Sequence, residues 1–430
     1  MTGIRFSAIF VAALAISLLV RLWLARRQIA CVSAHRSAVP PAFAARIGLP
    51  AHQKAADYTM AKQRLGIVET IVDAVVLVAL TLGGGLALLF GWTERIDAAP
   101  LWRDVILLVA IGVVGGLVSL PFSWWHTFRI EERFGFNRTT PKLWLTDIVK
   151  GVLVAIVLGL PLIVLALWLM RNAGALWWLW VWLAWLVFQV LMLVLFPTVI
   201  APLFNKFSPL PAGAARERIE QLLARCNFAA RGLFVVDGSK RSGHGNAYFT
   251  GFGRARRVVF FDTLLARLAP EELEAVLAHE LGHFKLRHVA KRVAWSAVLS
   301  LGFLALLAWL ATTPWFYAGL GIPVDAVDVA MTRPGVALAL FMLALPVFTF
   351  VLSPLSALYS RKHEFEADAF ASQNASAIAL TQALVKLYED NAATLTPDPV
   401  HSAFYDSHPP AAIRIARLEA LGAHAAPVPA

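Results

Sequence analysis

The chain has 430 residues, of which 59% are hydrophobic and only 15% are charged. Soluble domains carry about 25% charged residues, so this composition excludes an ordinary soluble protein and indicates a membrane protein with hydrophilic loops. The formal net charge is +11. We attribute this excess to basic loops between apolar segments and expect no nucleic-acid partner, because no basic stripe with interleaved aromatic residues occurs.

Seven apolar segments are each long enough to cross a lipid bilayer as a helix, which takes about 20 residues. They lie near residues 4–24, 67–91, 105–125, 149–170, 176–200, 290–312 and 336–359. We interpret the first as an anchor, because Arg26 and Arg27 follow it where a signal peptide would have a small-residue cleavage site. The run of glycines at 83–85 in the second segment indicates close packing against another helix.

The distribution of basic residues predicts the orientation of the chain. The loop after the first segment contains seven Lys and Arg residues, whereas the loop after the second contains two and is balanced by acidic residues. By the positive-inside rule the first loop is cytoplasmic, so the N-terminus lies outside and the C-terminus inside. We therefore divide the chain into a membrane region with five spans at 1–200, a cytoplasmic segment at 201–289, a transmembrane hairpin at 290–359 and a cytoplasmic segment at 360–430.

A predicted helix that begins at Pro270 carries the motif His279-Glu280-Leu281-Gly282-His283. Residues four apart project from one face of a helix, so His279 and His283 can bind one metal ion while Glu280 reaches a water beside it. Zinc in such a site lowers the pKa of the water to about 7, and the glutamate takes its proton. The alternative is two unrelated histidines with a chance glutamate between them.

A catalytic zinc has three protein ligands and an open position, so a third ligand must come from elsewhere. Glu364 and Asp368 lie four apart just after the seventh segment. Because two spans intervene, they are on the same membrane face as the zinc helix. Glu364 can bind zinc, and Asp368 can accept the free N–H of a ligand histidine. His363 is a rival ligand, whereas His288 is one residue out of register with the metzincin pattern and fits a supporting role.

Two short strand patterns, 233–236 and 257–261, follow an amphipathic helix near 213–227. Asn246 begins a stretch between them that could present a strand edge to an extended peptide. An ordinary hairpin is the alternative.

Taken together, the zinc motif and residues 364–368 resemble the type I CAAX prenyl endoproteases, which are membrane zinc metallopeptidases. The resemblance covers nearly the whole chain and also rests on residues 131–137, 200–207, 245–249, 261–264 and 407–410. It implies a mainly α, polytopic membrane protein with about seven transmembrane helices and a cytoplasmic zincin-like domain that contains a small β element.

The resemblance also implies a role for each matching position. The zinc ligands would be His279, His283 and Glu364, with one Zn²⁺ per chain, and Glu280 would be the general base. Asp368 would support a ligand, while Asn246 and His408 would face the substrate.

The implied substrate is a peptide or protein prenylated at a C-terminal cysteine and presented at the lipid bilayer. The compact chain resembles a bacterial member, which predicts the bacterial inner membrane. A bacterial host without prenylated proteins needs another substrate, so HtpX-like quality control of membrane proteins is an alternative. A third hypothesis is a transporter or scaffold in which zinc only joins the cytoplasmic segment to the seventh helix.

Overall fold

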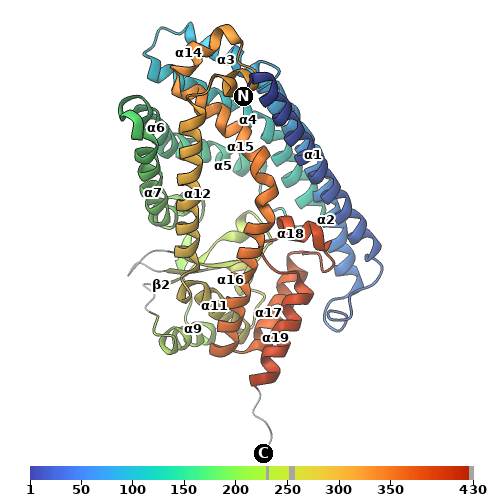
Figure 1. The fold of residues 1–430 in the computed structure, drawn as a ribbon. Coiled ribbons are helices and arrows are strands. Elements are labelled where there is room, and N and C mark those ends of the chain that lie inside the picture. The colour runs from blue at the N-terminus through green and yellow to red at the C-terminus, as the bar shows by residue number, and fades with distance from the viewer. Residues whose placement is uncertain (229–231, 251–256, 426–430) are drawn as a thin grey trace, which may run out of the picture.

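The computed structural model describes residues 1–228, 232–250 and 257–425. The protein is mainly helical, with long helices in the upper part of Figure 1 and a smaller mixed α/β part below them. The N-terminus and the end of α19 (Ala411–Ala425) lie at opposite ends of the molecule (Figure 1). An odd number of membrane crossings requires this arrangement.

Six helices or series of helices in the described residues are long and apolar enough to cross a membrane. They are α1 (Gly3–Ala34); α4 (Pro100–Trp125) with η1 (His126–Glu131); α5 (Pro141–Val154), η2 (Ala155–Gly159) and α6 (Leu160–Asn172) in series; η3 (Gly174–Leu176), α7 (Trp177–Leu195), η4 (Phe196–Ile200) and α8 (Ala201–Phe204) in series; α12 (His288–Leu310); and α15 (Pro334–Thr349), η7 (Phe350–Leu352) and α16 (Ser353–Asn374) in series. A bent helix pair brings the number to seven, in agreement with the sequence.

That bent pair corrects the interpretation of the second apolar segment. The segment consists of α2 (Leu49–Leu80) and α3 (Gly85–Glu94), which meet at an angle of 49°. Gly84 has a φ of 77°, and a Cβ at Gly85 would lie 2.7 Å from the carbonyl oxygen of Ala79. The glycine run therefore breaks the helix and folds against the last turn of α2, instead of packing against another helix as predicted.

A buried ion-pair cluster ties several helices together at the end of the molecule opposite to the α/β part. Asp104 of α4 is fully buried and accepts hydrogen bonds from Arg171, in α6, and from Nε of Arg333 at 2.8 Å. Arg333 immediately precedes α15 and also pairs with Glu94 of α3. Charged groups in a membrane protein are stable when they pair with one another in this way.

The α/β part contains a four-stranded sheet in the order β1-β2-β4-β3, made of β1 (Phe207–Pro209), β2 (Gly232–Val236), β3 (Ala247–Thr250) and β4 (Arg257–Phe261). Strands β2 and β4 run parallel, so the two strand patterns found in the sequence do not form a hairpin with each other. The hairpin alternative therefore applies only to β3, which pairs antiparallel with β4 at the edge of the sheet.

Helices cover the sheet and complete this part of the fold. The longer ones are α9 (Ala214–Arg225), α11 (Pro270–Lys285), α17 (Ala377–Asp390) and α19, and the short ones are α10 (Asp262–Leu265), α18 (Pro399–Tyr405) and η5 (Gly238–Lys240). The short helices α13 (Pro314–Gly319), η6 (Val324–Ala326) and α14 (Val327–Met331) instead connect α12 to α15 at the opposite end of the molecule (Figure 1). Helix α11 is the centre of the hydrophobic core, and its Leu277, Ala278 and Leu281 are fully buried. Its start is set by Pro270 and by Glu272, whose carboxylate accepts the backbone N–H of Ala269 at 2.7 Å.

Candidate metal centre

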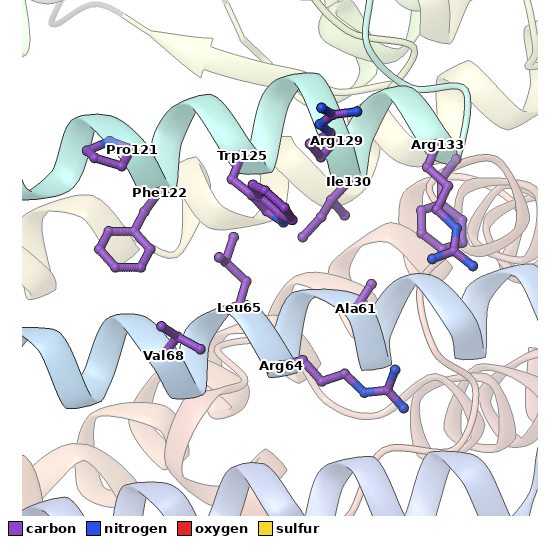
Figure 2. Close-up of a pocket in the computed structure, with 11 residues that line it drawn as sticks. Ala61, Arg64, Leu65, Val68, Pro121, Phe122, Trp125, Arg129, Ile130 and Arg133 are labelled. Atoms are coloured by element: carbon purple, nitrogen blue, oxygen red, sulfur yellow. The ribbon is translucent and has the colours of Figure 1, made fainter.

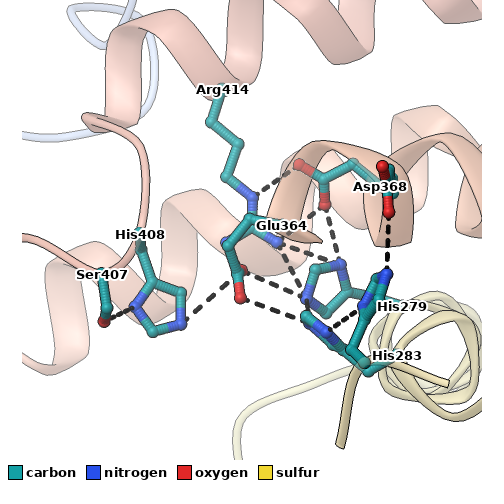
Figure 3. A network of polar contacts seen from close by, with 9 residues as sticks. His279, His283, Glu364, Asp368, Ser407, His408 and Arg414 are labelled. Atoms are coloured by element: carbon teal, nitrogen blue, oxygen red, sulfur yellow. Dashed lines mark hydrogen bonds and ion pairs between the residues drawn. The ribbon is translucent and has the colours of Figure 1, made fainter. Parts of the chain in front are cut away.

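The candidate centre lies where α11 crosses α16, which descends from the membrane helices into the α/β part (Figure 1). Gly282 allows the two helices to approach closely, since a Cβ there would lie 3.0 Å from Cα of Ala367. Two membrane helices separate α11 from α16 in the chain, as the sequence predicted. The histidines of α11 therefore meet the carboxylates of α16 (Figure 3).

The donor groups of three residues converge at this crossing. Nε2 of His279 lies 3.2 Å from Nε2 of His283 and 3.4 Å from Oε2 of Glu364, and Nε2 of His283 lies 3.3 Å from Oε1 of Glu364. Donor atoms around a tetrahedral zinc, at about 2.0–2.1 Å from it, are about 3.3 Å apart. Oε2 of Glu364 is buried and has no hydrogen-bond partner among the described residues. These residues therefore fit a metal ion.

The second ring nitrogen of His279 is held by a buried carboxylate. Nδ1 of His279 lies 2.8 Å from Oδ1 of Asp368, whose side chain is almost completely buried. Arg414 of α19 donates two hydrogen bonds to the same carboxylate, from Nε at 2.8 Å and from Nη2 at 2.7 Å. Because Asp368 accepts the proton on Nδ1, the lone pair on Nε2 faces the candidate metal position.

These neighbours also change the acidity of His279 and Glu280. Burial and the charge of Arg414 lower the pKa of His279, but the neighbouring carboxylates of Asp368 and Glu364 outweigh them and raise it to about 9. Burial raises the pKa of Glu280, although the two histidines of the motif oppose this shift. Glu280 forms no ion pair with any described residue. A free carboxylate with a raised pKa suits a general base near neutral pH.

His408 reaches the same cluster from the loop between α18 and α19. Its Nε2 lies 3.6 Å from Oε2 of Glu364, and its Nδ1 lies 3.0 Å from Oγ of Ser407. Figure 3 shows the imidazole pointing toward Glu364 from the side opposite to Asp368. The side chain is 63% exposed, so it can contact a molecule that approaches the cluster from solvent.

Asn246 does not contact this cluster in the described residues. It is exposed at the start of β3, and its side-chain oxygen accepts the backbone N–H of Ala247 at 2.8 Å. The preceding loop is held in place by His244, whose Nε2 lies 3.3 Å from Oε2 of Glu131, and by Asn391, which accepts the N–H of Gly245 at 3.1 Å. The stretch 131–137, singled out in the sequence, thus contacts the residues just before the stretch 245–249.

The two other candidate histidines lie outside the cluster of three donors. His363 is buried on α16, and its ring stacks on that of His288 with 4.0 Å between centroids. Nδ1 of His288 lies 2.9 Å from Nδ1 of His283. The geometry therefore favours Glu364 over His363 as the third ligand and gives His288 a supporting position.

One cavity of the described residues lies away from the metal centre. It has a volume of about 770 Å³ and is bounded by α2 on one side and by α4 and η1 on the other (Figure 2). Apolar side chains such as Leu65 and Phe122 line it together with Arg64, Arg129 and Arg133. None of the three metal donors lines this cavity, so the chemistry suggested by the cluster takes place elsewhere.

Arg414 is a residue of the centre that the sequence analysis missed. It is only 5% exposed and lies on the buried face of α19, between Ala411 and Leu418, which are three residues before it and four after it. A charged residue on the apolar face of an amphipathic helix is a signal for a buried ion pair, and this signal was present in the sequence.

Comparisons with known proteins agree with this geometry. A family described as CAAX prenyl protease N-terminal, five membrane helices, matches residues 28–206, and peptidase family M48 matches residues 209–421. A CAAX prenyl protease 1 homolog of Oryza sativa subsp. japonica is 38% identical over 320 residues, which cover 74% of this chain and 73% of that protein. The chain belongs to the CAAX prenyl protease 1 family. It is thus an M48 metalloendopeptidase with a metal-dependent site and an integral membrane protein with several spans.

Two further relatives support the membership. CAAX prenyl protease 1 of Saccharomyces cerevisiae is 36% identical over 332 residues, or 74% of this chain and 72% of that protein. The crystal structure of S. mikatae Ste24p has a TM-score of 0.88 and 29% identity, and the match covers 96% of this chain and 99% of that one. These relatives are eukaryotic, so the expectation of a bacterial member and of a bacterial inner membrane has no support.

Proposed function

We propose that this member of the family is a zinc endopeptidase that binds one Zn²⁺ per chain through His279, His283 and Glu364. The separations of 3.2–3.4 Å between their donor atoms are the observation that carries the proposal. Two histidines and one carboxylate are a common donor set of catalytic zinc, in which the fourth position stays open. Membership of a peptidase family argues against the transporter or scaffold alternative.

The residues around the metal position divide the chemistry among them. When bound, zinc would act as a Lewis acid, polarising the scissile carbonyl group and lowering the pKa of the attacking water. Glu280 accepts the proton of that water and passes it to the leaving amine. Asp368, held by Arg414, keeps His279 in the tautomer that binds metal through Nε2. His408 donates a hydrogen bond to the developing oxyanion, and Asn246 binds the substrate backbone from the edge of β3.

The proposed substrate is a protein with a C-terminal CAAX sequence that is prenylated on its cysteine. This rests on the relatives, since those of Oryza sativa and Saccharomyces cerevisiae are both described as CAAX prenyl protease 1 proteins. An HtpX-like role in quality control remains the alternative substrate class and is an outcome of the test below.

We also propose that the metal centre faces the cytoplasm, with the N-terminus outside and the C-terminus inside. The basic residues around the cavity of Figure 2 support this orientation, because Arg129 and Arg133 lie at the end of the α4–η1 series that contacts the α/β part, and Arg64 of α2 lines the same cavity. The segments 201–289 and 360–430 would then build the catalytic part, and 1–200 and 290–359 the membrane part.

The test compares cleavage of a farnesylated CAAX peptide with that of its unprenylated form by the purified full-length protein. We expect the wild type to cleave the farnesylated peptide and to contain one zinc. Glu280→Gln should keep the zinc and lose cleavage by at least about a hundredfold, because a general base contributes about 10²–10⁴ in rate. Glu271→Gln is the matched control, since Glu271 lies on the same helix, is 52% exposed and pairs with Arg218.

Each other outcome contradicts part of the proposal. Equal cleavage of both peptides, or cleavage only of a misfolded membrane protein, would reject the prenylated substrate and favour quality control. A wild type that holds zinc without cleaving any of these substrates would overturn the proposed endopeptidase activity. Activity in Glu280→Gln close to that of the wild type would remove Glu280 from its role.

A further inference from the structure

The two histidines of the metal centre are supported in different ways. Nδ1 of His279 is held directly by Asp368, as described above. Nδ1 of His283 instead lies 2.9 Å from Nδ1 of His288, and Nε2 of His288 lies 2.9 Å from Oε2 of Glu366. A chain of hydrogen bonds thus runs from His283 through a second histidine to a carboxylate that is 33% exposed.

The positions of these atoms determine where the protons lie. Nε2 of His283 faces the other donors of the centre, so its ring carries a proton on Nδ1 and donates it to Nδ1 of His288. His288 then carries its own proton on Nε2 and donates it to Glu366. We infer that His288 and Glu366 are positioning residues, which hold His283 in the tautomer and orientation that bind metal. This inference rests on the zinc site proposed above.

The turn between α11 and α12 explains how His288 reaches His283. In a continuous helix a residue five positions later would point about 140° away from His283, because each residue turns by about 100°. Helix α11 ends at Lys285, and Arg287 adopts a φ of 58°, in the left-handed region that non-glycine residues rarely occupy. This sharp turn brings His288, the first residue of α12, back against the end of α11.

Packing then fixes the ring of His288. The residue is fully buried, and its ring stacks on that of His363 at an interplanar angle of 10°. The ring of Tyr359 packs edge-on against His363, with 4.3 Å between centroids. The ring of His288 is thus held on its face by the stacked ring of His363 and at both nitrogens by hydrogen bonds, so it cannot rotate freely. A positioning residue requires this rigidity.

A second metal ion bound by His288, His363 and Glu366 is the competing interpretation, because their donor atoms lie within 4.8 Å of one another. The buried Nδ1 of His363 has no hydrogen-bond partner among the described residues, which favours a metal there. Against it, both nitrogens of His288 already have partners, and the lone pairs of two parallel stacked rings do not converge on one point. A metal would also leave Nδ1 of His283 without its acceptor.

The test measures zinc stoichiometry by elemental analysis and zinc affinity by competition with a chelator, on full-length protein in detergent. His288→Phe keeps the stacked ring and removes both nitrogens, and should weaken zinc binding by about 10–100-fold. His363→Phe is the matched control and should leave both stoichiometry and affinity unchanged. Because the side chain of Glu366 is partly exposed, replacing it should leave the packing of the core unchanged. Glu366→Leu should weaken zinc binding, while Glu366→Gln, which can still accept the N–H, should restore most of it.

The visible spectrum of the cobalt-substituted protein adds a readout that loss of packing alone would not change. We expect its d–d bands to shift in His288→Phe and to stay unchanged in His363→Phe. Two zinc ions in the wild type and one in each Phe variant would establish the second metal site and overturn the inference. Wild-type affinity in His288→Phe would also overturn it. Failure of the wild type to bind zinc would instead reject the proposed function, so the two failures are distinguishable.

Discussion

The close approach of α11 and α16 at Gly282 leads to a quantitative prediction for Gly282→Ala. A Cβ at this position would lie 3.0 Å from Cα of Ala367, 3.1 Å from Cβ of Phe370 and 3.2 Å from the carbonyl oxygen of Ala367. Carbon atoms in favourable contact are about 3.5–4.0 Å apart. Two of the three neighbouring atoms belong to the backbone of α16, so the helices must move apart by several tenths of an ångström.

This displacement opposes metal binding. Gly282 lies between the two histidine ligands on α11, and Ala367 follows Glu364 by one helical turn, so separating the helices separates the proposed donors. Overpacking of this kind costs about 1–3 kcal/mol. If zinc binding draws the helices back together, the same strain weakens zinc binding by about 5- to 150-fold. Unfolding should change less, because alanine favours a helix by about 1 kcal/mol over glycine.

The assay is the dissociation constant for zinc, measured by competition with a chelator for the purified wild type, Gly282→Ala and Gly302→Ala. Gly302 lies in the middle of α12, and a Cβ there would have no atom within 4 Å. Gly302→Ala should therefore bind zinc like the wild type. The reasoning fails if Gly282→Ala also binds zinc like the wild type, since the contact between the helices would then not control the spacing of the donors.

Two further predictions concern the surroundings of His279. Arg414→Met removes two hydrogen bonds from a buried carboxylate and should destabilise the protein by about 3–5 kcal/mol in thermal or denaturant unfolding, because Asp368 loses its cationic partner. Arg417→Met, one turn further along α19, removes only an exposed contact with the ring of Phe365 and should cost less than about 1 kcal/mol; equal losses in the two variants would refute this account. In the metal-free protein the pKa of His279 is about 9, so zinc must displace a proton at lower pH. The apparent zinc affinity should therefore rise about tenfold per pH unit between about pH 6 and 8. Calorimetric titration with zinc in buffers of different ionisation enthalpy should detect the released proton. An affinity that does not change with pH would contradict the raised pKa of His279.

Local signals in the sequence were sufficient for much of the metal centre. The spacing of His279 and His283 within a helix depends only on helical periodicity, and the start of that helix at Pro270 was correct. The even number of spans before Glu364 was enough to predict that it lies on the same membrane face. The roles assigned to His279, His283 and Glu364 as metal ligands, and to Glu280, Asp368, Asn246 and His408 around them, stay predictions.

Other features depended on contacts between distant segments. The break between α2 and α3 was missed because an apolar run with three glycines has the same composition whether it bends or packs closely. The parallel pairing of β2 and β4 depends on the connection that joins them, which strand patterns do not specify. Arg414 is 46 residues from Asp368, and its pairing arises only when α19 packs beside α16.

The sequence by itself determined the family, the number of membrane segments and the helix with its two histidines, because hydrophobic length and helical spacing are local properties. The spacing of Asp368 from Glu364 also predicted a carboxylate behind a ligand histidine, but only the tertiary structure decided which histidine it holds and which groups lie behind the other. Asp368 with Arg414 supports His279, and His288 with Glu366 lies behind His283. Hydrogen bonds act over about 3 Å, so such partners are defined by where the helices cross and turn. The spacing of residues along the chain does not say which histidine Asp368 contacts, or that Arg414, His288 and Glu366 complete the arrangement.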